Sequence, residues 1–161
     1  SAEVFGPSSR SNVSGWGALI PRAGGENLAD RPGAGKPASG PPGSVTLDPE
    51  YVLTSDPDFI ILSGTSPMGL GAVPEKEIKD RFNIVKRPGW DKLKAVRNNN
   101  VYEYQHELAR TCFVFYPALS FAKSFYPEAF QDIDPEARLA EFYDRFMLIK
   151  SRDGLWKMRL P

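Results

Sequence analysis

The sequence predicts an α/β fold: a three-layer αβα sandwich in which a central, mostly parallel sheet has helices on both faces. The first observation is the stretch 47–64, LDPEYVLTSDPDFIILSG, which has the features of a capped helix, a proline turn and a strand. The second is that residues 59–62, FIIL, form a continuous apolar run, as expected of a strand covered on both faces. The third is a set of apolar, helix-like segments later in the chain, which would supply the covering layers.

The helix in this stretch has clear local causes. Asp48 is a good N-cap, and Pro49 occupies a first-turn position where a missing N–H costs nothing. Glu50 lies in the first turn, where the helix dipole favours a carboxylate. Pro57 ends the helix, because the residue before a proline is pushed out of the α region.

The N-terminal part predicts a short strand at 3–5 and a small, polar loop at 8–17 that leads into a helix at 18–23. Trp16 stands between two glycines in that loop, so it is either a partly buried packing residue or a ligand-facing aromatic ring. The segment 30–44, DRPGAGKPASGPPGS, is nearly all Gly, Pro, Ala and Ser and predicts a mobile surface loop. It is too short to separate domains, so we expect residues 1–161 to form a single domain.

Two loops follow predicted strands and therefore lie on the expected ligand side of the sheet. The first, 63–74, carries Met68 and Leu70, which look exposed; it is either part of a cleft or a loop with an apolar plug. The second, 105–111 (QHELART), follows a strand at 101–104 whose side chains should alternate between faces.

The remaining elements follow from apolar spacing and turn residues. They are a helix at 75–82, a short strand at 84–85, a short buried helix with Trp90, Leu93 and Val96, an asparagine turn at 98–100, an apolar helix at 113–125, and a last helix capped by Asp134 with the apolar stripe Leu139, Phe142, Tyr143, Phe146 and Ile149. The tail around Trp156 has no predicted role.

Composition excludes several function classes. Lysine and arginine total 20, as do aspartate and glutamate, so electrostatics gives no reason to expect nucleic acid as a partner. No apolar run approaches the length of about 18 residues that spans a bilayer. The single cysteine, Cys112, excludes an internal disulfide and is expected to be a buried structural thiol. With only one histidine, His106, a zinc site is not expected.

No GxSxG elbow, phosphate loop or HExxH motif occurs in the sequence, so we predict a protein that is not an enzyme and needs no cofactor. The alternative is a small α/β enzyme of flavodoxin-like topology with its site near His106. Such an enzyme would require His106 and an acid, Glu107 or another, at hydrogen-bond distance.

Several motifs, in order, resemble the C-terminal lobe of the class III solute-binding proteins, which serve ABC importers of iron–siderophore complexes, haem and vitamin B12. They are GGENLA at 24–29, the helix with an early glutamate before the PDFIIL strand at 57–62, PGW at 88–90 with AV at 95–96 and NVY at 100–102, and AK at 122–123 with YPE at 126–128. The resemblance covers most of the chain from about residue 24 to residue 146.

The resemblance implies one α/β lobe of a two-lobe, extracytoplasmic binding protein that is membrane-anchored in its full-length form. Its partners would be the transmembrane subunits of an ABC permease and a metal chelate, namely a ferric siderophore, haem or a corrinoid. Glu50 matches the family's permease-docking carboxylate, although it could serve only its own helix dipole.

For ligand binding we expect Trp16, Met68, His106 and Arg110 to contribute. Arg110 could bind an anionic group or form a surface ion pair, and His106 would be a hydrogen-bonding wall residue rather than a metal ligand. Because the family proteins are about twice as long, we expect the present chain to supply one wall of the binding cleft.

Overall fold

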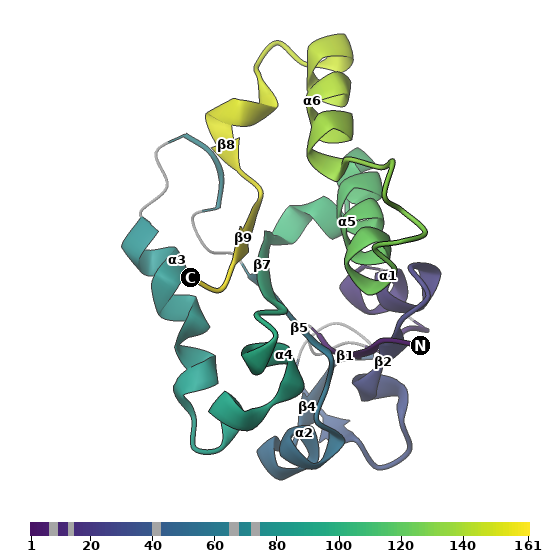
Figure 1. The fold of residues 1–161 in the computed structure, drawn as a ribbon, viewed down its shortest axis with the longest axis vertical. Coiled ribbons are helices and arrows are strands. Elements are labelled where there is room, and N and C mark those ends of the chain that lie inside the picture. The colour runs from purple at the N-terminus through teal and green to yellow at the C-terminus, as the bar shows by residue number, and fades with distance from the viewer. Residues whose placement is uncertain (7–9, 13–14, 40–42, 65–67, 72–74) are drawn as a thin grey trace.

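The computed structural model describes residues 1–6, 10–12, 15–39, 43–64, 68–71 and 75–161. Its centre is a five-stranded sheet in the order β2-β1-β5-β7-β9 (Figure 1). The strands are β1 (Glu3–Phe5), β2 (Glu26–Asn27), β5 (Phe59–Gly64), β7 (Val101–Gln105) and β9 (Lys157–Arg159). The first four run parallel to their neighbours, and β9 pairs with β7 antiparallel. The predicted mostly parallel sheet is confirmed.

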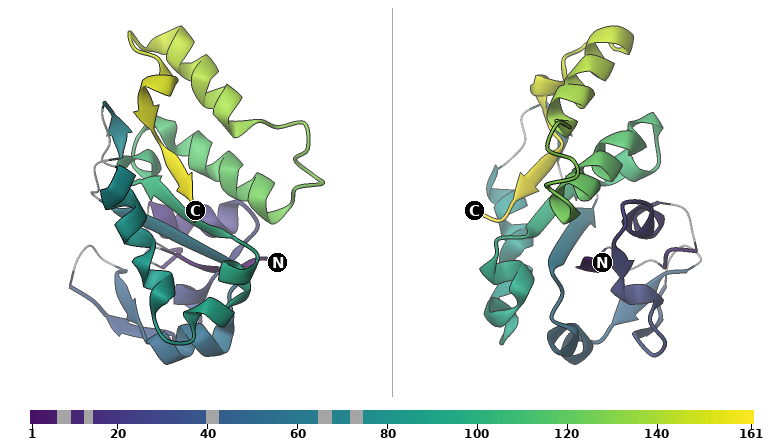
Figure 2. Two further views of the ribbon diagram at one scale, coloured as in Figure 1. Left: turned by 60° about the vertical axis from the view of Figure 1, so that its left-hand side comes forward. Right: turned by 45° about the vertical axis from the view of Figure 1, so that its right-hand side comes forward.

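Helices cover both faces of this sheet (Figure 2). The elements α1 (Trp16–Arg22), α5 (Phe115–Phe125) and α6 (Pro135–Phe146) pack on one face, while α2 (Pro49–Ser55), α3 (Glu75–Arg81) and α4 (Lys94–Arg97) lie on the other. Side chains of β5 alternate between the two layers: Phe59 and Ile61 belong to the first core cluster, and Ile60 belongs to the second. The fold is therefore the predicted three-layer αβα sandwich.

The stretch 47–64 folds as its sequence predicts. An Asp48 carboxylate oxygen accepts a hydrogen bond of 2.8 Å from the backbone N–H of Glu50, and Pro49 is the first residue of α2. Asp56 ends the helix in the left-handed region with φ 45°. Ile60 and Ile61 are 0% and 2% exposed, as a strand covered on both faces requires.

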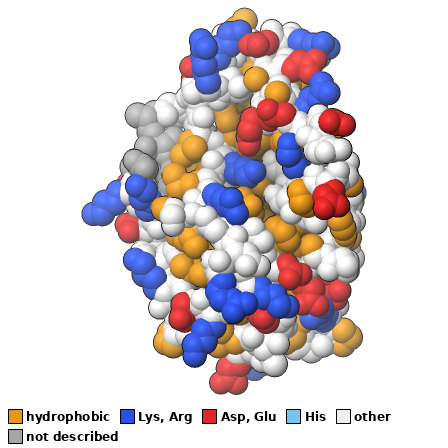
Figure 3. Space-filling view, viewed as in Figure 1, with side chains coloured by type: hydrophobic (Ala, Val, Ile, Leu, Met, Phe, Trp, Pro, Cys, Tyr) orange, Lys and Arg blue, Asp and Glu red, His pale blue; other side chains and the backbone are white. Residues whose placement is uncertain are grey.

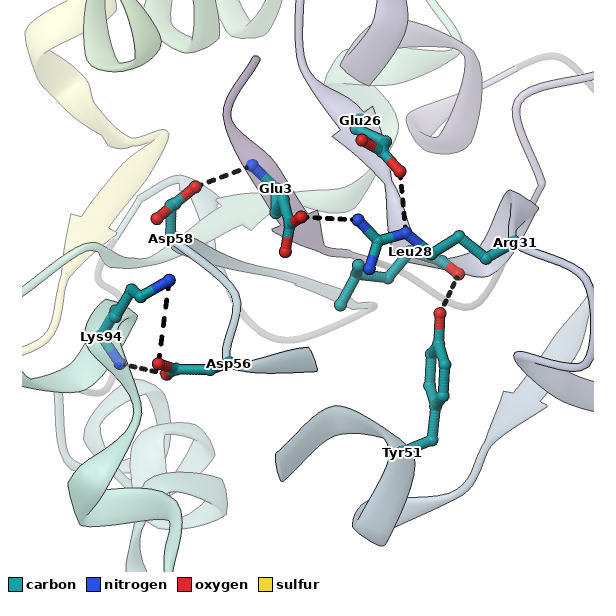
Figure 4. A network of polar contacts seen from close by, with 8 residues as sticks. All are labelled: Glu3, Glu26, Leu28, Arg31, Tyr51, Asp56, Asp58 and Lys94. Carbon is teal, nitrogen blue, oxygen red and sulfur yellow. Dashed lines mark hydrogen bonds and ion pairs between the residues drawn. The ribbon is translucent and has the colours of Figure 1, made fainter. Parts of the chain in front are cut away.

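A polar network joins the amino ends of three parallel strands (Figure 4). The Arg31 guanidinium contacts Glu3 of β1 at 2.6 Å and Glu26 of β2 at 2.7 Å. The backbone N–H of Glu3 donates to a carboxylate oxygen of Asp58, just before β5, at 3.0 Å. These contacts link β2, β1 and β5 at the end of the sheet opposite the predicted ligand side.

The glycine- and proline-rich segment 30–44 is more ordered than predicted. The strand β3 (Gly35–Pro37) pairs antiparallel with β4 (Val45–Leu47), and Ala34 is only 1% exposed. Gly35 permits this pairing, because a Cβ there would lie 2.4 Å from the backbone oxygen of Thr46. The prediction of a loop was therefore wrong for residues 35–37, while residues 31–34 and 38–39 are turns, bends or irregular; residues 40–42 are outside the described residues.

Several other predicted elements have a different type or different end residues in the structure. Residues 84–85, predicted as a strand, lie in a 3₁₀ helix (Phe82–Lys86), and the predicted helix at 18–23 begins earlier, at Trp16. The remaining 3₁₀ helices are Leu28–Asp30, Trp90–Lys92, His106–Ala109, Cys112–Val114 and Ser151–Asp153. The helix predicted at 113–125 therefore begins with a tighter turn before α5. Asn99 adopts φ 55°, which confirms the asparagine turn.

The C-terminal tail is part of the fold, which the sequence did not indicate. Its first strand, β8 (Gly154–Leu155), pairs with β6 (Gly69–Leu70), and β9 adds the edge strand to the main sheet. The Trp156 ring lies 5.5 Å from that of Tyr143 and 6.4 Å from that of Phe113, measured between ring centroids. The tail thus closes the layer formed by α5 and α6.

Some burial predictions were wrong. Cys112, expected to be a buried thiol, is exposed. Leu139 and Tyr143 are buried on α6, whereas Phe146 is 70% exposed and Ile149 lies beyond the end of the helix. Figure 1 shows the end of α6 beyond α5 and away from the sheet, which leaves the last turn of this helix at the surface. No helix in the described part of the chain has the length and apolarity needed to span a membrane.

Candidate functional site

The carboxyl ends of β5 and β7 meet at one edge of the sheet, because Gly64 pairs in register with Gln105. This pairing brings together the residues that follow the two strands. The Ser63 hydroxyl oxygen lies 3.2 Å from Nδ1 of His106, although 43 residues separate them. The two strand-to-helix segments predicted to face the ligand are therefore neighbours at this point.

Trp16 is buried in the core and supports this site through a hydrogen bond to the His106 backbone. Its side chain is only 3% exposed, and its ring lies 5.6 Å from Tyr104 and 6.1 Å from Phe121. The indole N–H donates a 3.0 Å hydrogen bond to the backbone oxygen of His106. The sequence left two alternatives for Trp16, a packing residue or a ligand-facing ring. This geometry agrees with a packing residue, and the same side chain also holds the His106 backbone in place.

Sequence reasoning missed an ion pair between Arg81, at the end of α3, and Glu103, in the middle of β7. The Arg81 Nε lies 2.7 Å from Oε1 of Glu103, whose side chain is 0% exposed. Burial raises the pKa of the Glu103 carboxyl, and the Arg81 charge opposes that rise. The available signal was an acid in the otherwise uncharged strand VYEYQ.

The ion pair holds the Arg81 guanidinium against the backbone of β5. A Cβ at Gly64 would come within 2.4 Å of the Arg81 Nη2 atom, so a larger residue there would displace the guanidinium from this position. The side chain of Arg81 is 33% exposed. One edge of the cation therefore faces Glu103, and the remainder lies at the carboxyl end of β5.

Arg110 follows the 3₁₀ helix that starts at His106 and is exposed. Arg110 forms no ion pair with any described residue. This observation disfavours the alternative in which Arg110 serves only as a member of a surface ion pair. Burial and the charges of Arg110 and Arg81 lower the pKa of His106, while Glu107 raises it. We call Ser63, Arg81, Glu103, His106 and Arg110 the strand-end cluster; it combines a neutral imidazole with two cations, one of which has a buried counter-ion.

The other predicted site residues lie outside this cluster. Met68 is 5% exposed and packs in the second core cluster, so the expectation that it is exposed was wrong, whereas Leu70 is 51% exposed. The neighbouring residues 65–67 and 72–74 of the predicted loop are outside the described residues. Glu50 is exposed on α2, near the amino end of β5, and makes no ion pair with any described residue.

The described residues do not assemble the site that the enzyme alternative requires. The hydrogen-bond partner of the His106 ring is the Ser63 hydroxyl, and the described part of the chain places no carboxylate at hydrogen-bond distance from the imidazole. Nor do the described residues contain a group of three His, Cys, Asp or Glu side chains that could hold a metal ion.

Comparison with known families agrees with this geometry. Residues 4–108, which include β2, β5, β7 and His106 and all but the first residue of β1, match the family described as "Periplasmic binding protein". This chain belongs to the periplasmic binding protein family. The predicted resemblance to class III solute-binding proteins is confirmed, and membership in this family implies an extracytoplasmic location. None of the curated proteins matches the sequence.

Solved structures extend the match to the whole chain. The TroA-like periplasmic binding protein FepB from Veillonella parvula is 32% identical, with a TM-score of 0.76 over 99% of this chain and 49% of its own. Two further structures share the fold. The molybdate-binding protein MolA of Haemophilus influenzae is 18% identical, with a TM-score of 0.57 over 92% of this chain and 42% of its own. Helicobacter pylori CeuE with Ni(II) bound is 16% identical, with a TM-score of 0.59 over 94% of this chain and 46% of its own. The chain spans about half the length of these proteins.

Proposed function

We propose that this chain is the C-terminal lobe of the substrate-binding component of an ABC importer, and that it captures an iron–siderophore or related metal chelate. The observation that carries the proposal is the strand-end cluster, which places two cations and an imidazole at the edge of the sheet where α/β folds bind ligands. The 32% identity to the periplasmic binding protein FepB from Veillonella parvula supports the role of a binding-protein lobe.

The proposed ligand contacts follow from exposure and charge. Arg110 is exposed and has no described counter-ion, so its guanidinium is available to a carboxylate, phosphate or catecholate oxygen of the chelate. His106, held by Ser63 and by the indole of Trp16, offers a neutral hydrogen-bonding wall. Trp16 would act from within the lobe by holding the His106 backbone, and Met68 would act as a packing residue of the second core cluster.

This ligand assignment is tested on the full-length protein that contains the chain, with the 161-residue chain alone as a comparison. Tryptophan fluorescence is titrated with ferric siderophores, haem, cobalamin and molybdate. A ligand held by Arg110 should bind about 10- to 100-fold more weakly to the Arg110→Gln variant, the range of a hydrogen bond to a charged group. Arg97→Gln, which changes an exposed arginine on α4, is the matched control and should bind normally. No response to any of the four ligands would refute the assignment.

We further propose that Glu50 is a permease-docking carboxylate. It is exposed on α2 with no described ion-pair partner, so it is free to meet an arginine of the transmembrane subunits, and Arg–carboxylate pairs orient two surfaces. The test is ligand-dependent ATPase activity of the reconstituted transporter. Glu50→Gln should reduce this stimulation while ligand affinity stays unchanged, and Glu128→Gln, at another exposed acid, should not. Equal stimulation by both variants would exclude the docking role.

A further inference from the structure

A second concave site lies between the start of α6 and the C-terminal segment that carries β8 and β9. It has a volume of about 290 Å³ and includes Tyr116, Glu136, Trp156 and Lys157 in its lining. In Figure 3, hydrophobic side chains gather over the middle of the face that also shows α6 and β8–β9 in Figure 1, with basic and acidic groups around them. None of the strand-end cluster residues lines this pocket.

The most informative group in the pocket is the ammonium of Lys157. Its side chain is 23% exposed, and the Nζ atom lies 5.2 Å from the ring centroid of Tyr102 and 5.8 Å from that of Tyr104. The nearest acid is Glu136, whose Oε1 is 3.9 Å from Nζ, beyond hydrogen-bond distance. No described residue accepts a hydrogen bond from this ammonium, although it carries three donors.

The surroundings determine what kind of acceptor would fit. Trp156 supplies an aromatic wall, held in place because its indole N–H donates to the backbone oxygen of Ser151 at 2.6 Å. Leu139 and Leu155 add apolar surface, and Arg152 adds a second cation. The charged side chains in the lining, Lys157, Arg152 and Glu136, give a net charge of +1. A single negative charge on a flat apolar body complements all of these features.

We propose that this pocket, which we call the α6–β9 pocket, binds a small organic monoanion, namely a carboxylate with an aromatic or apolar body. The carboxylate would accept hydrogen bonds from Lys157, and the body would lie against Trp156. A dianion such as phosphate is a poorer occupant, because the Glu136 carboxylate repels the second charge and phosphate has no apolar surface for the tryptophan. The volume of about 290 Å³ lies just below the range of about 300–1,000 Å³ for pockets that hold drug-sized ligands, so the occupant is a small molecule.

The indole N–H groups make a two-site experiment possible. That of Trp156 reports on the α6–β9 pocket, and that of Trp16 reports on the strand-end cluster through its bond to His106. The ¹⁵N-labelled protein is titrated with benzoate while the indole N–H signals are followed by NMR. Because the chain has three tryptophans, the Trp156→Phe and Trp90→Phe variants assign the Trp156 and Trp90 signals, and the remaining signal is that of Trp16. Saturable movement of the Trp156 signal at millimolar benzoate, with little movement for Trp16, is expected. Movement of Trp16 alone, or no movement, would overturn the proposal.

Benzamide and three variants then test the charge. Neutral benzamide should bind at least about tenfold more weakly than benzoate, as expected for loss of a charge-assisted hydrogen bond. Lys157→Met keeps the stem over the tyrosines and should weaken benzoate binding by a similar factor, whereas Lys92→Met, on the opposite layer, should not. Lys157→Arg, which keeps the cation, should retain most of the binding. Equal affinity for benzoate and benzamide, or for Lys157→Met and the unmodified protein, would refute the assignment.

Discussion

The buried ion pair between Arg81 and Glu103 gives the sharpest prediction about stability. Replacing Arg81 by Met removes the described ion-pair partner of a carboxyl group that is 0% exposed. Removal of one partner from a buried pair costs about 3–5 kcal/mol, because the remaining charge stays buried without compensation. Since the Arg81 side chain is itself 33% exposed, water partly screens the pair, and we expect a loss near the lower limit, about 3 kcal/mol.

The measurement is the free energy of unfolding by urea, supported by the melting temperature. For a chain of this size each 1 kcal/mol shifts the melting temperature by about 2–4 °C, so Arg81→Met should melt about 6–12 °C lower. The dependence on pH gives a second readout. In the variant, burial without Arg81 leaves the pKa of Glu103 further above its ordinary value of 4.5.

The sign of this pH effect follows from proton linkage. An acid with a raised pKa in the folded state binds more protons when folded, so the free energy of unfolding falls as the pH rises above its unfolded-state pKa. The stability gap between Arg81→Met and the unmodified protein should therefore be smaller at about pH 5 than at about pH 7.

A double variant separates the charge from the packing. Arg81→Met combined with Glu103→Leu replaces both members by apolar groups and should recover most of the lost stability, as replaced buried ion pairs often do. A loss below about 1 kcal/mol in the single variant would show that the pair is weak. A gap that does not change with pH, or a double variant no more stable than Arg81→Met, would refute the reasoning about a buried unpaired carboxylate.

Three other predictions concern the local chemistry of the fold. Asp48→Ala, which removes the N-cap of α2, should lower the free energy of urea unfolding by about 1 kcal/mol, and Asp48→Asn, which keeps a capping oxygen, should not; equal losses would argue against the cap. Cys112 is exposed, so the native protein should react with a thiol reagent as fast as the protein in denaturant; protection in the native state would contradict the structure. Leu148 is fully exposed, and Leu148→Ser should change stability by less than about 0.5 kcal/mol in the same urea assay, whereas a loss above that value would show that the side chain is covered.

Much of the fold could be predicted because its causes are local. The cap at Asp48, the proline that ends α2 and the apolar run of β5 act over a few residues, and the structure confirms all three. The ordered motifs of the binding-protein family were equally visible in the sequence, and residues 4–108 match that family. The sequence by itself therefore determined the α/β class and the family.

Tertiary structure decided the features that depend on which elements become neighbours. The C-terminal tail becomes an edge strand only because β7 offers it a free edge, and no local pattern encodes that pairing. Cys112 is exposed and Met68 is buried because of what covers each of them, which their own side-chain types do not specify.

The candidate site shows the same division. His106 and Arg110 could be selected from a strand-to-helix loop, whereas Arg81 joins them only because its ion pair with Glu103 spans α3 and β7. Local sequence sets backbone conformation through steric and capping effects, so it fixes elements and their ends. Contacts between residues far apart in the chain depend on how the elements pack, and only the folded chain established those that build the strand-end cluster and the α6–β9 pocket.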